Sequence, residues 1–376
     1  MHDDVLASHG GDIYALARSM KRRPEDFIDF SSNTHAFALD ITQSLIAATP
    51  HPFAHYPDTQ CAALRETLAA HEEVSQESIL VGNGAAELIW LAVLALNPRR
   101  VLLVGPMFSE YARVCEAFGV PYDIVTPPAE QEFVCGAREL HTMWGSQADL
   151  AVLCTPNNPS GATYPNIRDM LDVLRTPRVL IDNAYREFLW GDPAYADNRW
   201  VQYQQWIRPG VTVFSMNSAT KFFACPGIRL GYLVGDAGHL RRMGRIRPPW
   251  SVSPFAQVLG VRFFENIEAY RDRLPHLQLA RIDLAMRLRR MHMFDPDLVF
   301  EGPSFVTSGL RDGLGAHIVR QRLLQQGIIV RDCDSIPGMP KGFIRMQARC
   351  ADDNDALAQA LEWHTARGWS GTAGLA

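Results

Sequence analysis

Short apolar runs alternate with helical patterns between residues 79 and 235. We expect seven of these runs to be strands: Ile79–Gly82, Val101–Val104, Tyr122–Val125, Asp149–Cys154, Val179–Asp182, Val211–Ser215 and Leu230–Val234. Strands that alternate with helices along a chain form a mostly parallel sheet with helices on both faces. The pattern therefore predicts an α/β fold with a seven-stranded sheet, and ligands are expected at the carboxyl ends of its strands.

The last third of the chain has a different pattern. We expect strands and helices in the order Leu298–Phe300, Ala316–Gln325, Ile328–Arg331, Phe343–Arg349 and Asp353–Arg367. Between residues 343 and 349 apolar residues alternate with polar and basic ones, so one face of that strand is buried and the other carries arginines. This part predicts a second, smaller α+β domain.

Composition excludes several classes of protein. The 376 residues are 47% hydrophobic and 20% charged, which is typical of an ordinary globular chain. The formal net charge of −5 gives no general attraction to nucleic acid or to an anionic membrane. The basic run at 241–247 lies in a helical pattern broken by prolines, and we interpret it as a solvated helix face. We expect no nucleic-acid partner and no membrane partner.

The cysteines and the apolar runs indicate the cellular compartment of the protein. Seven scattered cysteines without C-x-x-C spacing argue against a disulfide framework or a metal site and favour a reducing cytoplasm. The first residues lack the basic and apolar parts of a signal peptide, and the most apolar run, Leu88–Leu96, is too short to span a bilayer. We expect a cytoplasmic protein without a metal.

A single lysine stands out after one of the predicted strand ends. Lys221 lies between Ser218 and Arg229, with a predicted strand on either side. A lysine amine forms a Schiff base with an aldehyde. If that aldehyde is pyridoxal 5'-phosphate (PLP), Ser218 and Arg229 can hold its phosphate by charge-assisted hydrogen bonds. Taken alone, however, a lysine and an arginine at this spacing are better explained as a surface residue and a structural one.

Three further stretches suit the same cofactor. Asp182 ends a strand and can pair with the pyridine nitrogen, while Tyr185 can bind the phenolic oxygen of the ring. Asn158 lies in a Pro/Asn/Gly turn after another strand. The Gly84-Ala85-Ala86 stretch opens an apolar helix whose N-terminus can bind a phosphate; the glycines could also suggest a dinucleotide site, but no acidic ribose partner follows at a strand end.

The order of these motifs resembles that of the fold-type I PLP enzymes of the aspartate aminotransferase superfamily, over nearly the whole chain. Within it, the chain is most similar to the histidinol-phosphate aminotransferases and to the L-threonine-O-3-phosphate decarboxylases of cobamide synthesis. The decarboxylase resemblance rests on three stretches: Ser8–Tyr14 (SHGGDIY), Asp29–Asn33 (DFSSN) and Thr220–Gly227 (TKFFACPG).

The resemblance implies a large PLP-binding domain at 35–270 and a small domain formed by 1–34 and 271–376. It implies that Tyr56 reaches the cofactor phosphate of a neighbouring subunit, so that the active unit is a homodimer. For the substrate it implies contacts from five further residues and from Asn158; the five are His9, Gly10, Asn33, Arg331 and Arg345. Phe108 either stacks on the cofactor ring or belongs to the core.

The resemblance implies PLP-dependent decarboxylation of a phosphorylated amino acid, most simply of L-threonine-O-3-phosphate to (R)-1-aminopropan-2-yl phosphate and CO₂. Lys221, Asp182 and Tyr185 would then be the catalytic groups. A histidinol-phosphate-type aminotransferase needs almost the same residues and stays the alternative, ahead of a non-catalytic PLP-binding protein. Asn33-Thr34-His35 replaces the Asn-Pro-Leu that is common in relatives, which leaves the identity of the substrate open.

Overall fold

The computed structural model describes residues 10–50, 53–134, 136, 148–164, 167–174, 176–191, 203–207, 209–311 and 313–369. Its largest element is a seven-stranded sheet with the order β2-β8-β7-β6-β5-β3-β4. The strands are β2 (Ile79–Asn83), β3 (Val101–Val104), β4 (Tyr122–Val125), β5 (Leu150–Cys154), β6 (Arg178–Asp182), β7 (Thr212–Ser218) and β8 (Leu230–Gly235). Only β8 runs antiparallel to its neighbours, so the predicted sheet is confirmed.

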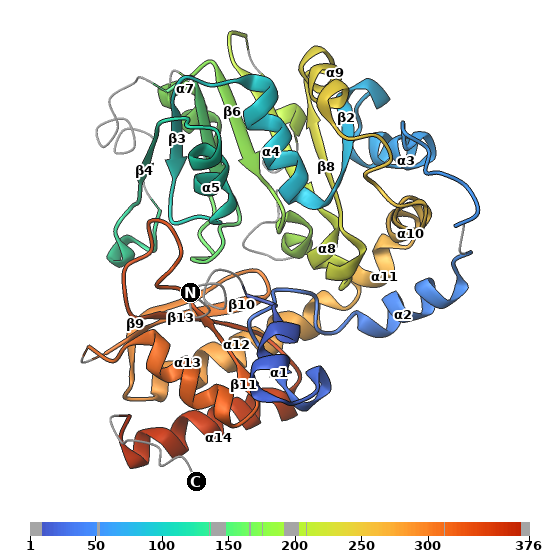
Figure 1. Ribbon diagram of the computed structural model, residues 1–376. Coiled ribbons are helices and arrows are strands. Elements are labelled where there is room, and N and C mark those ends of the chain that lie inside the picture. Colours follow the sequence, from blue (N-terminus) through green and yellow to red (C-terminus); the bar gives the residue numbers. More distant parts are fainter. Residues whose placement is uncertain are drawn as a thin grey trace.

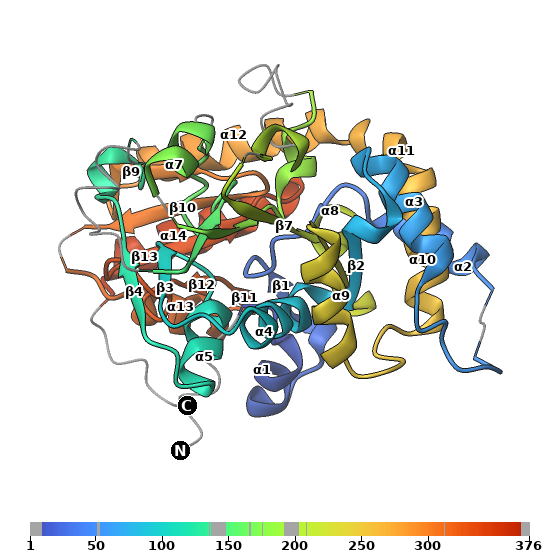
Figure 2. The same ribbon diagram turned by 90° about the horizontal axis from the view of Figure 1, so that it is seen from above.

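Both faces of this sheet are buried because successive side chains on its strands enter different hydrophobic clusters. Leu102 and Val104 belong to one cluster, and Val101 and Leu103 to the other. The first cluster includes residues of α3 (Ala62–Glu72), α7 (Ile167–Leu174) and α10 (Pro254–Glu265), and the second includes residues of α4 (Gly84–Leu96), α5 (Glu110–Ala117) and α9 (Ala237–Ile246). Figure 2 shows α4 and α5 on the opposite side of the sheet from α7.

A second, antiparallel sheet has the order β12-β13-β10-β9. Its strands are β9 (Phe294–Glu301), β10 (Phe305–Leu310), β12 (Arg331–Asp332) and β13 (Phe343–Gln347). It packs in one hydrophobic cluster with α12 (Leu274–Arg290), α13 (Ala316–Gln325) and α14 (Ala351–Arg367), at the bottom of Figure 1. The sequence analysis predicts this α+β unit but not β10, whose Thr307-Ser308-Gly309 centre looks like a turn. These residues are buried, and Thr307 Oγ1 donates to Pro159 O at 2.6 Å.

The N-terminal segment joins this smaller unit. After α1 (Ile13–Met20), strand β1 (Ile28–Asp29) pairs in parallel with β11 (Ile328–Ile329). Figure 1 shows α1 beside β11. The chain then passes through α2 (Leu39–Ala48) to the large sheet, and α11 (Ile267–Arg271) precedes α12 on the way back. The domain limits at 34/35 and 270/271 stay a prediction.

No helix in the described part of the chain is both long and apolar enough to cross a membrane. Within the same described ranges, no three His, Cys, Asp or Glu side chains gather as metal ligands would.

Candidate active site

The polar groups predicted after strand ends meet at one edge of the large sheet. Gly84 begins α4 directly after β2, Asn158 follows β5, and Asp182 is the last residue of β6. Lys221 lies in α8 (Ala219–Phe222), which begins where β7 ends. In Figure 1, α8 lies at the lower edge of the large sheet, toward the smaller unit. Because β2, β5, β6 and β7 run in the same direction, their carboxyl ends share this edge.

Asp182 is a buried carboxylate held from two sides. Tyr111 Oη donates to its Oδ2 at 2.9 Å, and the Ala184 backbone N–H donates to its Oδ1 at 3.1 Å. Burial raises the pKa of Asp182, whereas the bonds from Tyr111 and Ala184 oppose that rise by stabilising the charged form. The sequence analysis did not single out Tyr111. Its only signal was its position three residues after Phe108 in the same stretch.

Lys221 carries an amine that is easily deprotonated. Burial lowers its pKa from 10.5 to about 8, and the positive charges of Arg345 and Arg229 contribute to this shift. Asp182 acts in the opposite direction, which places the carboxylate within electrostatic reach of the amine. A lysine with such a pKa is partly neutral near pH 7.5 and can act as a nucleophile or exchange a proton.

An anion cradle lies beside this lysine. The guanidinium of Arg229 packs against Gly84 so closely that a Cβ at Gly84 would lie 2.5 Å from Nη2 of Arg229. Ser218 caps α8, and its Oγ lies 2.8 Å from Thr220 Oγ1. The first N–H groups of α4, at Ala85 and its neighbours, begin at the same glycine. A helix N-terminus, a hydroxyl and a guanidinium form a donor set that suits a phosphate.

The N-terminal segment reaches the sheet edge through Asn33. Its Nδ2 donates to the phenol oxygen of Tyr185 at 3.1 Å, and both residues are buried. Burial raises the pKa of Tyr185 to about 12, so the phenol stays protonated and can donate a hydrogen bond. This contact joins residues 152 positions apart.

Two arginines of the smaller sheet come close to these groups. Arg345 donates through Nη1 to Asn158 Oδ1 and through Nη2 to Ser31 O at 2.8 Å. Arg331 lies directly opposite Arg345 across the β12–β13 pair, and its Nη2 donates to Ser335 Oγ at 3.0 Å. Burial, together with the charge of Arg345, lowers the pKa of Arg331 to about 10. Two guanidinium groups this close favour an anionic ligand.

The remaining predicted residues differ in their placement. His9 lies outside the described residues, whereas Gly10 is beside Arg345, since a Cβ there would lie 3.5 Å from Arg345 Nη2. Phe108 is partly buried and packs against the hydrophobic cluster on the α4 and α5 face. Tyr56 is 81% exposed, and its ring centroid lies 4.8 Å from that of Trp250.

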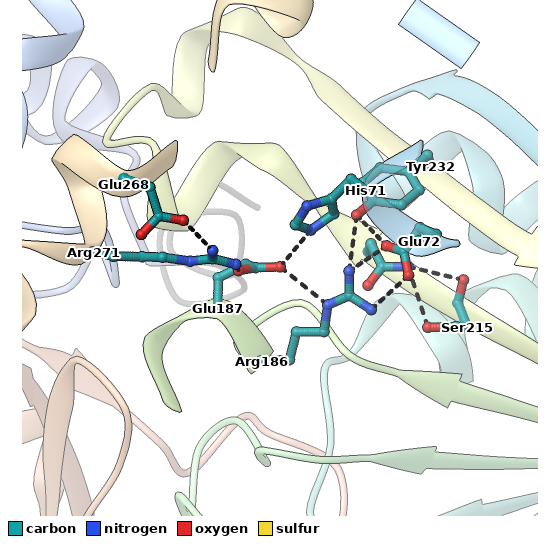
Figure 3. A network of polar contacts seen from close by, with 9 residues as sticks. His71, Glu72, Arg186, Glu187, Ser215, Tyr232, Glu268 and Arg271 are labelled. Atoms are coloured by element: carbon teal, nitrogen blue, oxygen red, sulfur yellow. Dashed lines mark hydrogen bonds and ion pairs between the residues drawn. The ribbon is translucent and has the colours of Figure 1, made fainter. Parts of the chain in front are cut away.

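Directly after Tyr185, two charged residues hold the site to its surroundings (Figure 3). Arg186 forms a buried ion pair with Glu72 of α3, which also accepts from Tyr232 Oη at 2.6 Å. Glu187 accepts from Arg271 of α11 at 3.0 Å, and its other carboxylate oxygen lies 3.0 Å from His71 Nε2. The sequence analysis missed this network because its partners come from three separate parts of the chain.

The chemistry of the residues at this sheet edge suits PLP. Asp182 is a buried carboxylate that could pair with the pyridine nitrogen, Lys221 carries an amine with a lowered pKa, and the cradle of Ser218, Arg229 and the α4 N-terminus suits a phosphate. The fold and this set of groups define a fold-type I PLP-dependent enzyme.

Residues 25–362 match the family described as aminotransferase class I and II, and the chain belongs to this family. It is 28% identical to the threonine-phosphate decarboxylase of Salmonella typhimurium over 94% of this chain and 96% of the relative. It is 28% identical to a histidinol-phosphate aminotransferase of Desulfitobacterium hafniense, over 82% of this chain and 83% of the relative.

Among solved structures, the histidinol-phosphate aminotransferase of Sinorhizobium meliloti in complex with PLP shares the fold, with a TM-score of 0.78. It is 18% identical and covers 94% of this chain and 95% of its own. The predicted superfamily, fold and PLP cofactor are thereby confirmed. The roles of individual residues stay predictions.

Proposed function

We propose that this enzyme decarboxylates a phosphorylated amino acid, with L-threonine-O-3-phosphate as substrate and (R)-1-aminopropan-2-yl phosphate as product, in cobamide synthesis. The observation that carries the proposal is the match to the Salmonella decarboxylase over 94% of the chain, against 82% for the histidinol-phosphate aminotransferase. The paired Arg331 and Arg345 support it, because the substrate carries both a carboxylate and a phosphate.

When bound, PLP supplies an electron sink that takes up the electron pair left as a bond at the substrate α-carbon breaks. The residues of this chain decide which bond breaks. Arg345 would hold the carboxylate, with Asn158 and Ser31 fixing its guanidinium in turn. With its carboxylate held in this way, the substrate would lose that group as CO₂.

Asp182, Tyr185 and Lys221 would control the protonation of the cofactor ring and of the substrate α-carbon. Asp182, oriented by Tyr111, would keep the pyridine nitrogen protonated, and Tyr185 would donate to the phenolic oxygen of the ring. Lys221 would return a proton to the α-carbon in place of the carboxylate, a transfer that its lowered pKa favours.

The alternative is an aminotransferase of the histidinol-phosphate type. It is favoured by the relative from Desulfitobacterium hafniense at the same 28% identity and by the near-identical needs of the two reactions. Lys221 would then move a proton between two carbons, and no CO₂ would leave. The non-catalytic alternative is disfavoured because Lys221 and the whole anion cradle are present.

We also propose a cytoplasmic homodimer. Tyr56 is exposed and its ring is tilted against that of Trp250 at the surface, which supports a role for its phenol in the site of a second copy. The surrounding surface also exposes Phe53, whose ring lies 6.2 Å from that of Phe255. Exposed aromatic groups of this kind are typical of an interface.

The deciding experiment mixes the holoenzyme with L-threonine-O-3-phosphate in the absence of any oxo acid and follows CO₂ together with the cofactor absorbance. Sustained CO₂ release with an unchanged cofactor spectrum is expected, and Lys221→Ala should abolish it. Stoichiometric conversion of the cofactor to pyridoxamine phosphate without CO₂ would instead establish the aminotransferase.

A further inference from the structure

A cavity lies between the N-terminal glycine turn and the smaller sheet. Gly10, Gly11 and Ser31 border it on one side, and Arg320, Arg331 and Asp332 on the other. Arg331 was already predicted to bind the substrate, but Arg320, on α13, has no role in the site described so far. The cavity therefore adds a second guanidinium beside Arg331.

Arg345 lies directly opposite Arg331 in the smaller sheet, and Arg331 and Arg320 line the same cavity. Arg345 lowers the pKa of Lys221, and Arg345 and Arg320 both lower the pKa of Arg331. Arg345 is thus the neighbour that Lys221 and Arg331 share, and Arg320 adds to the positive field around Arg331. Like charges that lie close together in a partly buried place repel one another, and an anion bound between them relieves this repulsion.

The carboxylates at the cavity are engaged by the backbone. Asp12 Oδ1 accepts from Ala15 N at 3.1 Å and caps α1, and Asp332 Oδ1 accepts from Asp334 N at 2.9 Å. Burial lowers the pKa of Arg320, and Asp332 opposes this shift without cancelling it. Arg320 therefore presents a positively charged guanidinium at this cavity, next to Arg331.

The two glycines keep the cavity open on the other side. A Cβ at Gly10 would lie 2.6 Å from Ser31 O, so a side chain there would force the turn away. Gly11 has a φ of +83°, which favours glycine, and its N–H donates to Ser31 Oγ at 2.9 Å. The Gly10-Gly11 turn is thus held against Ser31. Because glycine has no side chain, neither residue fills the cavity next to Arg320.

We propose that Arg320 is a specificity-determining residue that binds, together with Arg331, the phosphate monoester of the substrate, while Arg345 holds the carboxylate nearer to Lys221. The inference rests on the proposed function, since it names the group that selects phosphorylated over unphosphorylated amino acids. A guanidinium pair suits a phosphate dianion because each fork can donate two parallel hydrogen bonds.

The test compares the holoenzyme with Arg320→Gln, and with Arg322→Gln as the control. Arg322 lies on the same helix but acts on His364 of α14. Calorimetry measures the binding of inorganic phosphate, O-phospho-L-threonine and L-threonine. Arg320→Gln should weaken the two phosphate ligands by about tenfold or more and leave L-threonine unchanged, because a hydrogen bond to a charged group contributes about that much. Arg322→Gln should change none of them.

Kinetics give a second readout. KM for the phosphorylated substrate should rise in Arg320→Gln with kcat nearly unchanged, because Arg320 lies away from the reacting bond. Equal weakening of L-threonine and O-phospho-L-threonine, or an equal effect of Arg322→Gln, would overturn the inference. Wild-type phosphate binding in Arg320→Gln would also overturn it.

If Arg320→Gln does not fold, Arg320→Lys replaces it. Lysine keeps the positive charge but lacks the two parallel N–H donors of the guanidinium, so wild-type phosphate affinity in Arg320→Lys would contradict bidentate binding.

The failure of this inference is distinguishable from the failure of the proposed function. If O-phospho-L-threonine releases no CO₂, the proposed decarboxylation is wrong, but the calorimetry with inorganic phosphate still decides the role of Arg320. If CO₂ is released at the wild-type rate and KM by Arg320→Gln, the decarboxylase stands and the phosphate role of Arg320 is wrong.

Discussion

At the scale of single residues, the chemistry depends on how easily Lys221 loses its proton. With a pKa of about 8, roughly a quarter of the amines are neutral at pH 7.5, against about a thousandth at the ordinary pKa of 10.5. Burial is the main cause, followed by the positive charge of Arg345. The same arginine that would bind the substrate carboxylate therefore also helps to activate the lysine.

This dependence predicts the pH profile of cofactor uptake. Only the neutral amine attacks the PLP aldehyde, so the rate at which the apoprotein takes up PLP should rise with pH and level off above about pH 8. In Arg345→Gln the midpoint should move to a higher pH, because removal of a neighbouring positive charge stabilises the ammonium form. Stopped-flow absorbance measures the rate.

Arg349→Gln is the matched control for this prediction. Arg349 follows β13 but pairs with Asp353 at 2.7 Å, and Lys221 should not respond to its loss. An unchanged midpoint in Arg345→Gln, or an equal change in Arg349→Gln, would contradict the electrostatic role of Arg345.

At the scale of elements, the ion pair of Glu72 and Arg186 joins α3 to the loop that follows β6. Arg186 is adjacent to Tyr185, so this pair anchors the segment that carries the phenol. The pair is buried, and without Glu72 the charge of Arg186 is left only with Glu187, whose Oε1 lies 3.3 Å from Arg186 Nε. The element that presents Asp182 and Tyr185 thus depends on a helix more than a hundred residues away.

We predict that Glu72→Ala lowers the free energy of unfolding by about 3–5 kcal/mol, because Arg186 stays charged and buried with only Glu187, a carboxylate that it shares with His71 and Arg271. Glu66→Ala, at an exposed position of the same helix, should cost less than about 0.5 kcal/mol. Urea unfolding measures both. Replacement of Arg186 by Met in the Glu72→Ala background should recover part of the loss; a further loss would show that the charge was not its cause.

At the scale of the whole molecule, the proposed dimer makes each site depend on two chains. Tyr56 is exposed at the surface of one chain, whereas Lys221 is partly buried at the sheet edge of the same chain. If the phenol binds the phosphate of PLP in the other subunit, Tyr56→Phe should weaken PLP binding by about tenfold without dissociating the dimer. Tyr14→Phe, at a second exposed tyrosine, is the control.

Mixed dimers test directly whether Tyr56 of one chain completes the site of the other. When Tyr56→Ala and Lys221→Ala chains are refolded together, one site of each mixed dimer has both an intact lysine and an intact tyrosine. Activity should therefore exceed that of either variant alone, and sedimentation should show dimers throughout. No gain of activity in verified mixed dimers would contradict a shared site.

Much of the fold could be predicted because its signals are local. The seven strands of the large sheet follow from short apolar runs, and the side chains at their carboxyl ends follow from chain order. Lys221, Asp182 and Asn158 were found this way, since each lies within a few residues of a strand end. β10 was missed because burial of Thr307 and Ser308 depends on partners elsewhere in the chain.

The sequence by itself determined the class of fold and the residues that suit PLP, because periodicity and strand ends are properties of neighbouring residues, and the order of its motifs resembled that of the superfamily. Only the tertiary structure decided that Tyr111 supports Asp182, that Asn33 reaches Tyr185, and that Arg320 stands beside Arg331 at a cavity. The first two contacts join residues 71 and 152 positions apart. No local pattern encodes such pairs, since they form only when the packed sheets and helices bring distant segments together.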